Sequence, residues 1–129
     1  MASIFTKIIN REIPAYIVGE NDNYIAFLDV SPLQKGHTLV IPKNETDFIF
    51  DVDDNELTGL ILFAKSIAKK INSAFDCNRV GMSVIGLEVP HAHIHLIPIN
   101  KMEDMMFNNA KLDLTKEEFL QIQSKIVKQ

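Results

Sequence analysis

The most restrictive feature of this chain is a segment between two prolines, residues 90–98, in which histidines alternate with apolar side chains. Three of the four histidines lie at positions 91, 93 and 95. Side chains at i, i+2 and i+4 of a β-strand point to the same face of the sheet. The alternation therefore predicts a strand over residues 92–97, with three imidazoles on one face and Ala92, Ile94 and Leu96 on the core face.

The rest of the hydrophobic pattern predicts helices and strands in a mixed order. Apolar residues recur at spacings of three and four over residues 4–9 and 55–75, and again after Thr115, which predicts a short, a long and a C-terminal helix. Further strands are expected at residues 16–19, 24–28, 38–41 and 80–85. The strands flanking residues 32–36 lack a helical crossover, so they are expected to be antiparallel. The expected class is α+β, with a mostly antiparallel sheet of about five strands.

Smaller signals refine the ends of these helices. Thr115 followed three residues later by Glu118 spells a capping box at the start of the C-terminal helix. Asp53 followed by Glu56 imitates the same box before the long helix, with a carboxylate in place of the hydroxyl.

Length and composition set limits on the class of protein. The chain has 129 residues, of which 47% are hydrophobic, which suits one domain over residues 1–129 with its own core. The formal charge of −4 argues against sequence-independent binding to nucleic acid, which requires a basic surface. Cys77 is the single cysteine, so neither a disulfide within the chain nor a cysteine-based zinc site is expected. Without a membrane-spanning run or a leader pattern, we expect a cytoplasmic protein that does not engage membranes.

Three histidines on one face allow three explanations. A structural role for all of them is the least favoured, because polar rings seldom line up in a core without a function. A metal site is possible, since neutral imidazole is the commonest metal ligand. Covalent catalysis on a phosphate ester is also possible, with one imidazole attacking phosphorus and its neighbours stabilising the phosphoryl oxygens. The spacing alone leaves the last two open.

The segment over residues 91–97, His-Ala-His-Ile-His-Leu-Ile, resembles the signature of the histidine triad (HIT) family. The resemblance extends to other parts of the sequence and points to the nucleotide-binding branch of that family. The matching blocks are residues 3–9, 12–15, 26–32 and 36–43. The resemblance covers residues 3–99 and implies a HIT core over 1–99 followed by an extension with a helix over 100–129.

The resemblance implies a nucleotide hydrolase or nucleotidyl transferase, a nucleoside phosphoramidase, that works without a metal or other cofactor. His93, in the middle of the triad, would be the nucleophile that attacks the α-phosphorus. His91 and His95 would bond the phosphoryl oxygens and handle the leaving-group proton. His37, outside the triad, would lie behind it and fix the tautomers of its rings.

The resemblance also implies a nucleotide pocket and a partner. The candidate binding residues carried over by position are Phe5, Ile8, Phe27, Asp29, Val30, Glu88 and Val89. Asp29 would accept from the ribose hydroxyls, although it is also placed to form a turn before Ser31 and Pro32. Ile8 suits the core as well as the pocket. A homodimer joined near the long helix is expected, with a purine nucleotide or its conjugate as the small-molecule partner.

One departure from the family pattern keeps a second function open. Leu87 stands where many relatives carry a glutamine, and Glu88 places a negative charge beside the triad. A nucleotide-binding or scaffolding module with little turnover is therefore the alternative to an enzyme. The two differ in whether substitution of His93 changes turnover.

Overall fold

A computed structural model describes residues 2–129 and shows an α+β fold with one five-stranded antiparallel sheet. The order of strands across the sheet is β1-β2-β3-β5-β4. Their bounds are Ile17–Glu20 for β1, Tyr24–Leu28 for β2, Thr38–Pro42 for β3, Arg79–Ser83 for β4 and Ile94–Ile99 for β5. The expected fold class is confirmed.

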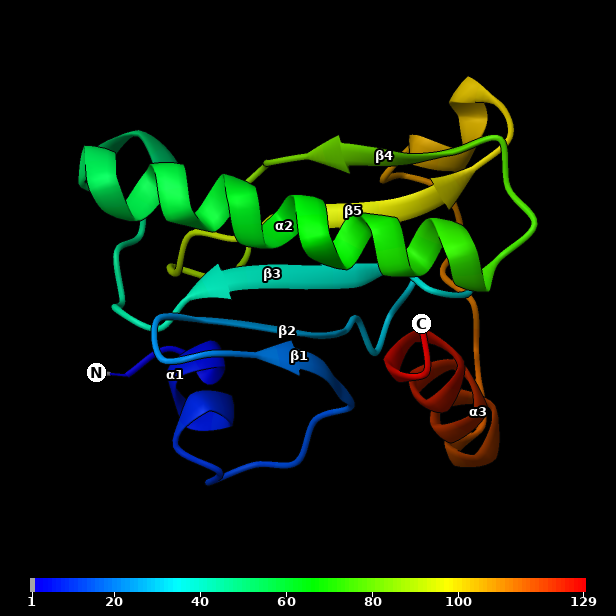
Figure 1. The fold of residues 1–129 in the computed structure, drawn as a ribbon, viewed down its shortest axis with the longest axis horizontal. Helices are drawn as coiled ribbons and strands as arrows, with labels where there is room; N and C mark the ends of the chain where they lie inside the picture. Colours follow the sequence, from blue (N-terminus) through cyan, green and yellow to red (C-terminus); the bar gives the residue numbers. More distant parts are fainter. Residues whose placement is uncertain (1) are drawn as a thin grey trace.

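Helices cover both faces of this sheet. The long helix α2, Asp54–Ala74, crosses one face, and α3, Lys116–Val127, packs beside it (Figure 1). The short helix α1, Ile4–Ile9, covers the other face. Its Phe5 and Ile8 pack there against side chains of β2 and β3. Two short 3₁₀ helices, Ile49–Asp51 and Met102–Met105, complete the elements.

The two covered faces explain the composition of the central strands. All five residues of β2 and all five of β3 are buried. Along β2, Ala26 and Leu28 face the α2 side, whereas Ile25 and Phe27 face the α1 side. Such strands show continuous apolar runs rather than alternation, because neither face meets water.

Strand β5 begins later than the histidine pattern predicts. It starts at Ile94 rather than at residue 92, because the N–H groups just before it bond to loops instead of to a strand. His91 donates to the carbonyl of Val89, and Ala92 donates to the carbonyl of Thr46. The neighbouring strand β4 ends at Ser83, opposite His95, and not at residue 85 as expected. Ile94 and Leu96 do face the core on the α2 side.

Helix ends differ from expectation in one detail. Thr115 and Glu118 form the predicted capping box of α3. Helix α2 starts at Asp54, and the side chain of Asp53 makes no capping bond. The capping box expected from Asp53 and Glu56 therefore does not form.

Gly36 forms the tight turn that positions His37 at the start of β3. Its φ of +98° lies in the left-handed region, where a side chain is strained. A Cβ there would also come within 2.7 Å of the Phe75 ring. The turn places His37 directly before β3, whose first residue, Thr38, donates its hydroxyl to the Gly36 carbonyl.

Among the described residues, no helix is both long and apolar enough to cross a bilayer.

Candidate active site

A cavity of about 290 Å³ opens on the face of the sheet that carries α1. His93 and His95 lie in its wall. All seven candidate nucleotide-binding residues line it as well: Phe5, Ile8, Phe27, Asp29, Val30, Glu88 and Val89. Most of the wall is apolar, which suits a planar base more than a sugar or phosphate chain.

The backbone fixes the tautomer of His93. Its Nδ1–H donates to the carbonyl oxygen of His91 at 2.7 Å, because a carbonyl can only accept. In the neutral ring, Nε2 is then the nitrogen with a free lone pair. The ring of Phe5 contacts His93 edge-to-face with centroids 5.1 Å apart, and the His95 ring lies 4.9 Å away. The ring is thus held in one orientation with its basic nitrogen available.

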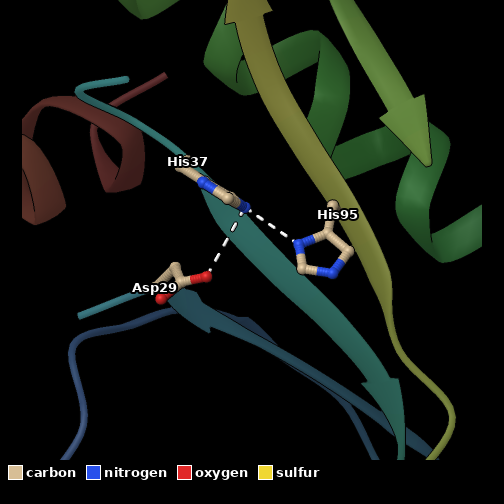
Figure 2. A group of neighbouring side chains, drawn as sticks. All are labelled: Asp29, His37 and His95. Carbon is tan, nitrogen blue, oxygen red and sulfur yellow. Dashed lines mark hydrogen bonds and ion pairs between the residues drawn. The ribbon is translucent and has the colours of Figure 1, made fainter. Parts of the chain in front are cut away.

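A second hydrogen-bond chain fixes the tautomer of His95 (Figure 2). The N–H of Leu33 donates to Nδ1 of His37 at 3.0 Å, so the proton of His37 is on Nε2. That Nε2–H donates to Nδ1 of His95 at 2.9 Å. The proton of His95 is therefore on Nε2, which points away from His37. His95, which lines the cavity, therefore carries an N–H donor at Nε2, the complement of the lone pair on Nε2 of His93.

Burial keeps this pair uncharged. It lowers the pKa of His37 to about 3 and the pKa of His95 to about 4, with neighbouring positive charges adding to the effect. Asp29 Oδ2 lies 3.5 Å from His37 Nε2. Because the ring of His37 is neutral, the two residues do not form an ion pair. The same Nε2–H donates to His95 at the shorter distance of 2.9 Å. Burial also raises the pKa of Asp29, although its Oδ1 accepts from the Ser31 N–H at 2.8 Å.

These buried neutral rings predict acid sensitivity. Both pKa values lie below the reference of 6.5, so the unfolded chain binds protons that the folded chain refuses. Stability is then complete above pH 6.5 and falls as pH drops toward 4. We expect a loss of about 1–2 kcal/mol for each histidine between pH 7 and pH 5, measured by urea unfolding. The His95→Gln variant should lose less over the same interval, and an equal loss would contradict this assignment.

His91 lies apart from the cavity. It is completely buried, and both ring nitrogens bond within the protein. Nε2–H donates to the carbonyl of Pro42 at 2.8 Å, and Nδ1 accepts from the Ser3 hydroxyl at 3.0 Å. Burial is the main cause that lowers its pKa, partly offset by the bond to Pro42. The three histidines of the motif therefore have three different environments.

Phe107 is a site residue that sequence reasoning missed. Its ring contacts His95 edge-to-face with centroids 4.8 Å apart, and it lies 6.3 Å from His37. It belongs to the segment after β5, which the bond from Leu112 N–H to the Pro32 carbonyl fastens beside the β2–β3 loop. Only the clustering of apolar residues there could have signalled it.

Replacing Phe107 with Ala should expose the buried imidazole pair. Water would then stabilise the charged form of His95, so its pKa should rise from about 4 toward 6.5. Titration of the imidazole protons by NMR measures this directly. Leu120→Ala, which removes an exposed apolar side chain from α3, is a matched control that should leave the pKa in place. An unchanged pKa in the Phe107 variant would refute its role as a cover.

One group of side chains could geometrically hold a metal ion. Among the described residues, Asp29, His37 and His95 have ligand atoms within 4.8 Å of one another (Figure 2). This differs from the triad set considered from the sequence, in which His91, His93 and His95 would be ligands. A metal would have to displace the proton shared by His37 and His95. The hydrogen-bond chain from Leu33 therefore competes with a metal for the same lone pairs.

Comparison with known proteins agrees with this architecture. The HIT domain family matches residues 10–102. The chain belongs to the HIT family. An uncharacterised HIT-like protein of Borreliella burgdorferi is 39% identical over 95% of this chain and 94% of its own length. Adenosine 5'-monophosphoramidase HNT1 of Saccharomyces cerevisiae is 38% identical over 75% of this chain and 62% of its own length.

A solved HIT structure has the same fold along nearly the whole chain. The Hit-like protein of Bartonella henselae, which is involved in cell-cycle regulation, superposes with a TM-score of 0.85 at 33% identity. The match covers 98% of this chain and 94% of that one. The resemblance read from the sequence motifs ended at residue 99, but the segment after residue 100 has a counterpart both in this HIT structure and in the Borreliella relative.

Proposed function

We propose that this protein is a metal-independent nucleotide hydrolase that cleaves a nucleoside phosphoramidate, or a related nucleotide conjugate, at the α-phosphorus. The observation that carries the proposal is the complementary pair of rings in the cavity wall. His93 offers a lone pair at Nε2, and His95 offers an N–H, side by side. The naming of related proteins as adenosine 5'-monophosphoramidases supports this substrate class.

The first step is attack of the His93 Nε2 lone pair on phosphorus. The new N–P bond forms as the bond from phosphorus to the leaving amine breaks, and the amine takes up a proton from water. His95 Nε2–H donates to a phosphoryl oxygen where negative charge develops. Because the pKa of His95 is lowered to about 4, the ring acts at neutral pH as a hydrogen-bond donor and keeps its proton.

Water completes the cycle. It attacks the phosphorus of the nucleotidyl-histidine, the N–P bond breaks, and His93 regains its lone pair. The attacking water releases a proton to solvent, which replaces the one that the amine took up in the first step. The net reaction consumes one water and releases a nucleoside monophosphate and an amine. The covalent intermediate divides one difficult displacement into two easier steps.

The cavity residues are proposed to hold the nucleoside. The rings of Phe5 and Phe27 pack edge-to-face with centroids 5.4 Å apart and would form one wall of the base pocket. Asp29 Oδ2 would accept from the ribose hydroxyls, since Oδ1 is already committed to the Ser31 turn. Val30 is 67% exposed and would close over the base when a nucleotide binds.

A homodimer remains our expectation for the assembly. Strand β4 is an edge of the sheet, and apolar side chains on β4 and α2 are exposed, among them Met82, Ile61 and Leu62. Such an edge can pair with a second copy through backbone bonds. Sedimentation at micromolar concentration should give twice the chain mass of 14.6 kDa.

Turnover of an adenosine phosphoramidate in the presence of a chelator tests the proposal. We expect release of adenosine monophosphate at an undiminished rate in excess EDTA. A panel with guanosine phosphoramidates and dinucleoside polyphosphates identifies the preferred base and leaving group. Nucleotide binding without turnover of any member would favour the binding-module alternative.

A further inference from the structure

A polar cluster runs from the buried ring of His91 to the protein surface and joins three parts of the chain. Ser3 and Thr6 come from the start of α1, Glu45 comes from the loop after β3, and His91 comes from the triad segment. The Glu45 carboxylate Oε1 accepts from the Ser3 N–H at 2.6 Å and from the Thr6 hydroxyl at 2.7 Å. The Ser3 hydroxyl donates to His91 Nδ1 at 3.0 Å.

This cluster holds His91 from one side while the backbone holds it from the other. Nε2–H of His91 donates to the Pro42 carbonyl, only three residues before Glu45. The next residue, Ala92, donates its N–H to the Thr46 carbonyl at 2.7 Å. The segment of residues 42–46 therefore fixes both the ring of His91 and the backbone that follows it.

The carbonyl of His91 is the acceptor that orients His93. Its position depends on the backbone of His91, which the ring anchors. When Nε2 of His93 bonds to phosphorus, the ring becomes cationic, and its bond from Nδ1–H to that carbonyl strengthens. An acceptor in the right place therefore stabilises the transition state more than the bound substrate.

We propose that Glu45 and Ser3 are positioning residues that act through His91 to hold the nucleophile His93 in its productive tautomer and orientation. His91 is then a positioning residue itself and not a ligand of the phosphate. Two observations support this role. Neither ring nitrogen of His91 is free, and the residue does not line the cavity. The bonds from Ser3 and Thr6 also lower the pKa of Glu45 to about 2, so its carboxylate is charged at every working pH.

The proposal rests on the proposed function for its kinetic readout but has a second readout that needs no substrate. The ¹⁵N shifts of the His93 ring report directly which nitrogen carries the proton. In the wild-type protein we expect one dominant tautomer with the proton on Nδ1. In Ser3→Ala we expect a mixture of tautomers, because His91 loses the donor at its Nδ1 and the His91 carbonyl loses its fixed position.

The kinetic test compares Ser3→Ala, Ser3→Thr and Glu45→Ala with a matched control, Glu20→Gln. Glu20 is also a paired surface carboxylate, bonded to Arg11 and Lys43, but it has no bond to the cluster. We expect kcat to fall by about tenfold to 100-fold in Ser3→Ala and Glu45→Ala, with KM within about twofold. Ser3→Thr keeps a hydroxyl and should restore most of kcat, and Glu20→Gln should equal the wild type.

Folding is measured alongside, because Ser3 also caps α1 by accepting from the Thr6 N–H. Assays are run well below the thermal midpoint of each variant. A single Nδ1–H tautomer of His93 retained in Ser3→Ala would overturn the proposal, as would kcat lowered equally in Ser3→Ala and Ser3→Thr. If the wild type turns over no substrate, the proposed function fails, and the tautomer comparison still decides the positioning role.

Discussion

Replacing His93 with Ala should abolish turnover of an adenosine phosphoramidate, with kcat reduced on the order of 10⁴-fold or more. The reason is that Nε2 of His93 carries the free lone pair of the triad beside a donor, His95. His91 cannot replace it, because both of its nitrogens are bonded within the protein. A steady-state assay with a sensitive product readout measures the loss.

Binding is the control for this variant. Removal of the ring leaves the apolar wall and Asp29 in place, so affinity for adenosine monophosphate should change by no more than a few fold. Calorimetry reports this affinity. Full turnover in His93→Ala would exclude covalent catalysis by this residue, whereas loss of both binding and folding would call for the smaller change His93→Asn.

Replacing His95 with Ala should lower kcat by about 10²–10³-fold, the usual cost of one donor to a developing oxyanion. The structure adds a sharper expectation about leaving groups. Because His95 is neutral with its proton on Nε2, we expect it to stabilise the phosphoryl oxygen without giving up the proton. The loss should therefore be the same for substrates with good and poor leaving groups.

A series of phosphoramidates with amines of increasing basicity tests this point. A loss in His95→Ala that grows with the basicity of the amine would show that His95 supplies the leaving-group proton. That result would also contradict the tautomer set by Leu33 and His37. His95→Gln, which keeps an N–H donor of similar length, should recover part of kcat.

Most of the fold could be predicted from the sequence because the spacing of apolar residues indicates which face of each helix or strand is buried. The stripe of α2 and the capping box of α3 are local signals and were predicted correctly. The start of β5 was not, since it depends on where its partner strands end. Thr46 lies far from Ala92 in the sequence, and no local pattern reports the bond between them.

The site divides in the same way. The row of histidines and the apolar pocket could be proposed from a motif and a family resemblance. The separate environment of His91 could not, because it arises from Ser3 and Glu45, which contact it only in the folded chain. Phe107 was missed for a similar reason, since its ring reaches His95 only because the chain folds back after β5 has crossed the sheet.

The most direct test of the central claim is to trap the covalent intermediate. Enzyme mixed with an adenosine phosphoramidate is quenched within the first turnover, digested and examined by mass spectrometry. The account predicts adenosine monophosphate attached to His93 and to no other histidine. Product release in a burst with an unmodified His93, or nucleotide found on His95 or His91, would contradict it.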